Sequence, residues 1–133
     1  IVIFMIDSRA DVSSPDFSPQ FTQEAVASMQ YLVDNITRKD VSKEISRKAK
    51  RIAKSDYRPQ IFCLLINKMD RWWNPMSQHL WDHDLQREHP VVRPFREQLR
   101  ALRKAGIRAE VDAISAQTGM RVPQTFIGLL ELL

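Results

Sequence analysis

Three short apolar runs along the chain have the pattern of buried strands. The runs at 1–6 and 61–66 are continuous, contain β-branched residues and are short, which is typical of strands covered on both faces of a parallel sheet. A third run, at 107–114, alternates in part between apolar and polar residues, which indicates a strand nearer the edge of the sheet. The pattern therefore predicts three strands.

Apolar residues spaced by three and four positions predict a helix after each strand. The first begins near Pro19, a residue favoured in the first helical turn, and carries an apolar stripe over 21–36. The second covers 94–104 and is ended by Gly106, as glycine does just beyond a helix end. The third covers 122–133, with apolar residues at Phe126, Leu129, Leu130 and Leu133.

Two further segments depart from this regular pattern. The segment 38–58 contains nine basic residues against three acidic, and its apolar residues keep a helical period, so we expect a basic helical insert. A solvated helix face is favoured over contact with nucleic acid or an anionic membrane, because no aromatic residues are interleaved for base stacking. The segment 71–90 is rich in Trp, His, Asn and Pro, and we expect mainly a loop with a helical turn near 77–85.

The alternation of strands and helices predicts the fold class. Right-handed crossovers between the strands give an α/β fold in three layers, α/β/α, with a mainly parallel sheet. Ligands bind such sheets at the carboxyl ends of the strands. Asp7, the segment 67–70 and the segment 115–117 all fall at those ends, so we expect the functional site there.

Two polar motifs follow the second and third strands. Asn67-Lys68-Met69-Asp70 resembles the N-K-x-D guanine-specificity motif of P-loop GTPases with a Ras-like G domain, and Ser115-Ala116-Gln117 resembles their S-A-K motif. Each is weak alone, but their order, at successive strand ends separated by one helix, is much more specific. A plain strand-to-helix turn, where Asn and Asp bond locally, is the alternative for 67–70.

The resemblance implies a role for each motif residue in binding GTP or GDP. Guanine presents two adjacent donors, the ring N1–H and the exocyclic amino group, and the carboxylate of Asp70 can accept both. Adenine has no such donor pair, so a buried carboxylate would stay unpaired against it. The other roles implied are these: Lys68 lies along base and sugar, Asn67 ties its loop to the phosphate loop, Ala116 donates its backbone N–H to the guanine carbonyl, and Ser115 shapes its loop. Gln117 stands where the family has lysine, so the resemblance does not imply that a second side chain covers the base from this loop.

A phosphate-binding motif is missing from the sequence. The pattern G-x-x-x-x-G-K-[ST] does not occur, since none of the glycines, Gly106, Gly119 and Gly128, is followed by lysine. In the family, the first half of the domain supplies that loop and the elements that organise Mg²⁺ and the attacking water. The resemblance thus implies that residues 1–133 are the C-terminal half of a G domain, not catalytic alone, with Mg²⁺ expected only alongside the N-terminal half.

A different class of function stays open beside this one. The chain can instead be a degenerate G-like module that binds a protein partner without nucleotide turnover. Three tryptophans in one loop are a candidate partner surface, although packing is the commoner role of such residues. These residues are Trp72, Trp73 and Trp81.

Metal sites are weaker alternatives. Asp7 opens a segment that fails the D-x-S-x-S metal motif of von Willebrand A-type domains at Arg9 and Asp11. His79 and His83 would share a helix face, but a third ligand at a convincing spacing is missing, so a solvated loop is favoured there. This interpretation also covers the neighbouring residues Asp82, Asp84 and His89.

The remaining composition bears on compartment. Cys63 is the only cysteine, so no internal disulfide forms, and a reducing, cytoplasmic location is expected. The apolar runs are much shorter than the roughly 20 residues that span a bilayer. At 133 residues and 44% hydrophobic content, the chain is expected to form one globular domain or part of one.

Overall fold

The computed structural model describes residues 1–7, 19–37 and 59–133, and the basic helical insert predicted at 38–58 lies outside them, as do residues 8–18. Its strands form one parallel sheet, as the sequence pattern predicts, and their order in the sheet is β1-β2-β3. Asp7 lies opposite Asn67, so the carboxyl ends of β1 and β2 are level. The strands are β1 (Val2–Asp7), β2 (Ile61–Asn67) and β3 (Arg108–Ala113).

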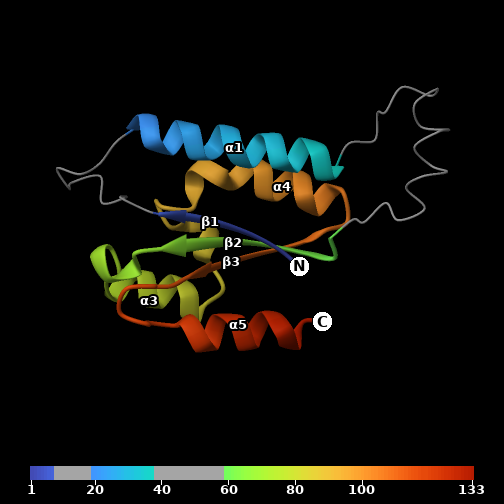
Figure 1. Ribbon diagram of the computed structural model, residues 1–133. Coiled ribbons are helices and arrows are strands. Elements are labelled where there is room, and N and C mark those ends of the chain that lie inside the picture. The colour runs from blue at the N-terminus through green and yellow to red at the C-terminus, as the bar shows by residue number, and fades with distance from the viewer. Residues whose placement is uncertain (8–18, 38–58) are drawn as a thin grey trace, which may run out of the picture.

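Helices cover both faces of this sheet, giving the α/β class expected from the sequence (Figure 1). One face carries α1 (Pro19–Thr37) and α4 (Arg96–Lys104), and the other carries α5 (Val122–Glu131). A shorter helix, α3, and three single turns of 3₁₀ helix connect β2 to α4. They are η1 (Met69–Arg71), α3 (Pro75–Asp82), η2 (Gln86–Glu88) and η3 (Arg93–Phe95). No helix in the described part of the chain is long and apolar enough to cross a membrane.

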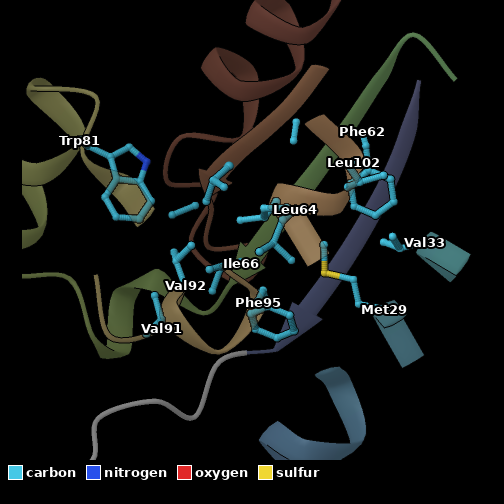
Figure 2. Close-up of a cluster of buried hydrophobic side chains, with 14 of the residues drawn as sticks. Met29, Val33, Phe62, Leu64, Ile66, Trp81, Val91, Val92, Phe95 and Leu102 are labelled. Atoms are coloured by element: carbon cyan, nitrogen blue, oxygen red, sulfur yellow. The ribbon is translucent and has the colours of Figure 1, made fainter. Parts of the chain in front are cut away.

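The larger core lies between the sheet and the pair α1 and α4 (Figure 2). The predicted stripe of α1 buries Met29 and Val33 completely, and β2 contributes alternate residues from Phe62 to Ile66. Gly106 ends α4 as expected, with φ of 80° in the left-handed region that favours glycine. Side chains fully buried in this core include Met29, Val33, Phe62, Leu64, Ile66, Val92 and Leu102.

The opposite face is covered less completely. A small cluster lies beneath α5 and consists of Ile61, Cys63, Leu65, Ile114 and Leu129. The expectation that the strand at 1–6 is buried on both faces is wrong, because Ile3 is 41% exposed and Met5 is 57% exposed. They lie opposite Cys63 and Leu65 in the register, so α5 reaches over β2 and β3 but leaves β1 open.

The connection at 71–90 is more ordered than the loop we expected. The predicted helical turn is the helix α3, which Asn74 caps by accepting a hydrogen bond from the Ser77 backbone N–H at 2.9 Å. Trp72 and Trp81 are buried, and so is His89, which we expected to be solvated. Segments rich in tryptophan and proline are apolar as well as turn-forming, and here the indoles join the main core.

Candidate functional site

The two motifs meet at the carboxyl ends of β2 and β3. Met69 donates its backbone N–H to the Ile114 carbonyl at 3.0 Å, which joins the segment after β2 to the end of β3. Lys68 has φ of 64°, a left-handed conformation that is uncommon outside glycine and Asn, and it turns the chain into η1. The predicted site residues therefore share one edge of the sheet.

Asp70 is held in place by Ser115. The Ser115 hydroxyl donates to Asp70 Oδ1 at 2.7 Å, and the Ser115 side chain is completely buried. The same hydroxyl accepts the Thr118 backbone N–H at 3.3 Å, and the Ser115 carbonyl accepts from Gly119 at 2.8 Å. Ser115 therefore links its own loop to the carboxylate that the sequence singles out.

The carboxylate of Asp70 is exposed to solvent. No described residue donates a hydrogen bond to its Oδ2. We expected a buried carboxylate, but Asp70 lies in η1, outside β2, and is exposed. Ala116 and Gln117 are exposed beside it on the second loop, so this edge presents an open polar surface.

Asn67 connects all three strand ends. Its side-chain amide donates to Asp7 Oδ1 at 2.9 Å, and its Oδ1 accepts the Ala116 backbone N–H at 2.9 Å. The resemblance assigns Asn67 to a phosphate loop and leaves the Ala116 N–H for guanine. In the structure both groups of Asn67 bond within this chain, and the Ala116 N–H has an acceptor.

Asp7 lies at the same strand ends, where the sequence places it, and it contacts Asn67 and Lys68. Its Oδ2 lies 3.5 Å from Lys68 Nζ, in addition to the bond from Asn67. The pair is partly exposed, with 31% of the Lys68 side chain and 45% of the Asp7 side chain accessible, so its contribution to stability is small. The level ends of β1 and β2 were the available signal, because parallel strand ends lie side by side.

The three histidines do not form one group: the ring centroids of His79 and His83 lie 4.2 Å apart, whereas His89 packs against Trp72. His83 Nδ1 lies 2.8 Å from the His79 carbonyl, whereas His89 is buried with Nε2 3.0 Å from the Ser77 hydroxyl. The Val91 backbone N–H donates to His89 Nδ1, so that nitrogen carries no proton and Nε2 donates to Ser77. Across the described ranges, no three His, Cys, Asp or Glu side chains are grouped to hold a metal ion. The remaining positions of the Asp7 metal motif lie outside those ranges.

The tryptophans pack together. The Trp72 ring centroid lies 5.9 Å from that of Trp81 and 4.9 Å from that of His89, and Trp73 lies 5.1 Å from Trp81. Trp72 and Trp81 are buried, and Trp73 is partly buried with Arg121 over its ring at 5.9 Å. This arrangement places two of the three indoles in the protein interior.

Comparisons of the chain with protein-family models, with curated proteins and with solved structures found no match. The functional assignment therefore depends on the residues and on the geometry of the strand ends.

Proposed function

We propose that this chain is the guanine-recognising part of a GTPase domain. One observation carries the proposal: the Asp70 carboxylate and the Ala116 backbone N–H stand on adjacent loops, linked to each other through Ser115 and Asn67. A carboxylate acceptor beside a backbone donor is complementary to the edge of guanine, which presents two N–H donors next to a carbonyl oxygen.

The bond from Ser115 supports this role for Asp70. The bond holds Asp70 Oδ1 2.7 Å from the Ser115 hydroxyl, so the side chain is already ordered before a ligand binds. An exposed aspartate without such a bond would lose rotational freedom on binding. Two acceptor oxygens in a fixed plane can receive the ring N–H and the exocyclic amino group together. In the same proposal, the guanine carbonyl takes the Ala116 N–H in place of Asn67 Oδ1, and Lys68 lies along the base.

Phosphate binding, Mg²⁺ and hydrolysis fall to another part of the domain in this proposal. The sequence has no phosphate-loop motif, so the chain alone is expected to bind GTP or GDP weakly and not to turn it over. Among the described residues β1 pairs with β2 alone, which leaves one of its edges for a further strand. Ile3 and Met5 are exposed on the face of β1 that α5 leaves open, where further protein packed on the sheet would bury apolar surface.

The test is an NMR titration with millimolar GDP or ADP, using the chain and its Asp70→Ala variant. We expect GDP to shift the backbone amides at 67–70 and 115–118 at concentrations at least about fivefold below those of ADP, equivalent to roughly 1 kcal/mol. Asp70→Ala should abolish the preference, and Glu97→Ala, an exposed carboxylate on α4, should keep it. Equal responses to GDP and ADP in the wild-type chain would contradict the proposal.

A second candidate function is a protein-interaction module on a G-domain-like fold without nucleotide turnover. The observation that favours it is a set of large apolar residues that stay exposed on β1 and along the C-terminal segment, because apolar side chains exposed together mark interaction sites. Since Trp72 and Trp81 are buried, these residues are better candidate contacts than the tryptophan loop. They are Ile3, Met5, Phe126, Ile127, Leu130 and Leu133. The GDP titration separates the two functions.

A further inference from the structure

Three arginines line a cavity of about 300 Å³ beside β3. Arg108 is the first residue of β3, Arg87 comes from η2, and Arg103 comes from the last turn of α4. Arg108 lies opposite Ile61, at the amino end of β2, whereas Asn67 is the last residue of β2 and Asp70 follows it. The cavity is therefore separate from the guanine-binding loops.

The three side chains differ in how they are bonded. Arg108 forms an ion pair with Glu110, and Arg87 Nη2 donates to the Ala109 carbonyl at 3.2 Å. The bond from Arg87 satisfies a carbonyl on the strand next to the cavity. The Arg103 side chain forms no hydrogen bond or ion pair with any described residue.

The charges in the cavity are not balanced. Burial lowers the pKa of Arg87, and the positive charge of Arg103 lowers it further, while Asp84 and Glu110 act in the opposite direction. The guanidinium groups of Arg87 and Arg103 therefore repel each other across the cavity. Asp84 and Glu110 also line the cavity, and Glu110 pairs with Arg108. Three arginines therefore face two carboxylates, so the lining keeps one excess positive charge.

We propose that this cavity binds a small phosphate-bearing anion between Arg87 and Arg103. A phosphate anion offsets the excess positive charge and offers several acceptor oxygens to the planar guanidinium forks. A volume of about 300 Å³ is at the lower end for small-molecule sites, which selects a compact phosphate ester or inorganic phosphate over a polymer. This site does not depend on the guanine assignment.

The experiment is a titration of the full 133-residue chain with inorganic phosphate, at an ionic strength held constant with chloride and followed by backbone amide shifts. We expect saturable shifts at residues 86–87 and 108–111, with at least tenfold weaker binding in Arg103→Gln. Arg103 is exposed, so this substitution leaves the fold intact. Arg100→Gln removes an exposed charge from the same helix outside the cavity and should bind phosphate as the wild type does.

Two results would overturn the site. Equal phosphate affinity in the wild type and in Arg103→Gln would show that Arg103 does not bind the anion. Shifts that follow ionic strength without saturating would show general charge screening and no specific site. Asp70→Ala should leave phosphate binding unchanged, so a loss of guanine preference and a loss of this site are distinguishable.

Discussion

The two faces of the sheet hold their helices by different interactions. Beneath α1 and α4, alternate residues of β2 pack with two helices into a continuous apolar core. Beneath α5, the apolar cluster is small, and a carboxylate adds to it: Asp112 accepts from Trp81 Nε1 at 3.2 Å, from Arg121 Nη2 at 3.0 Å and from Thr125 Oγ1 at 2.7 Å.

This difference indicates where the stability of the chain resides and where further protein would add to it. Apolar burial on the α1 and α4 face excludes water from both sheet and helices. The α5 face depends on polar bonds to one side chain, and most of the apolar positions of α5 stay exposed. Of the four apolar residues that the sequence singles out in the helix predicted at 122–133, only Leu129 is buried, while Phe126, Leu130 and Leu133 are exposed.

The largest expected effect is on the closed face. Leu64→Ala removes a completely buried side chain at the centre of β2, and a loss of about 2–5 kcal/mol in the free energy of unfolding is expected. Urea denaturation measures it. Leu130→Ala is the matched control, since Leu130 is 65% exposed on α5 and should change the value by less than about 0.5 kcal/mol. Similar losses in both variants would abolish the distinction between the faces.

The next effect concerns the polar attachment of α5. Asp112→Ala leaves four donors without their acceptor, the three side chains named above and the Ala113 backbone N–H, at a cost of about 1–3 kcal/mol. Burial, followed by the charges of Asp112 and Glu110, raises the pKa of Cys63 beneath this helix to about 12, so its thiol reacts only when the cluster opens.

Alkylation of Cys63 measures that opening. We expect alkylation to be much faster in Asp112→Ala than in Glu110→Ala. The second variant also removes a negative charge near the thiol, but the bond it breaks is the one with Arg108 and not a bond to α5. Equal rates in the two variants would mean that charge, and not the attachment of α5, controls access to Cys63.

A pH-dependent effect is expected from His89 within the larger core. Burial, and then the charge of Arg93, lowers the pKa of His89, so the unfolded chain binds a proton more readily than the folded chain does. Stability should therefore fall as pH drops below about 6.5, the ordinary value of histidine. Protonation would also break the bond from Val91 to Nδ1.

Denaturation at pH 7.5 and pH 5.5 tests this loss. His89→Gln should flatten the dependence of stability on pH, and His79→Gln, an exposed histidine on α3, should keep it. An unchanged pH dependence in His89→Gln would assign the effect to other groups.

The smallest effect on stability is expected on the open face. Met5→Lys changes a residue that is 57% exposed on β1, so the free energy of unfolding should change by less than about 0.5 kcal/mol. Lysine on an edge strand opposes pairing between copies, so self-association measured by sedimentation should decrease. A loss of several kcal/mol would show that this face is covered in solution.

The regular elements were predictable from sequence because their periods are local properties. The strands at 61–66 and 107–114 and the stop at Gly106 follow from pattern and backbone preference. The open face of β1 was not predictable, because burial of Ile3 depends on how far α5 reaches. A continuous apolar run does not carry that information.

The candidate site was predictable in its residues but not in its bonds. Asn67, Asp70 and Ser115 were identified from motif and position, and the structure brings them together. The engagement of the Ala116 N–H by Asn67 and the contact of Asp7 with Lys68 depend on side-chain geometry across strands. Sequence spacing alone does not determine such contacts.

The central claim, that Asp70 reads guanine, is tested most directly by changing what it can read. Asp70→Asn keeps the shape of the side chain but replaces one acceptor with a donor, which suits xanthine, whose ring N–H lies beside a carbonyl. We predict that the wild-type chain prefers GDP to xanthosine diphosphate and that Asp70→Asn reverses the preference, as measured by amide shifts at 67–70 and 115–118. The same preference in both proteins would contradict the account.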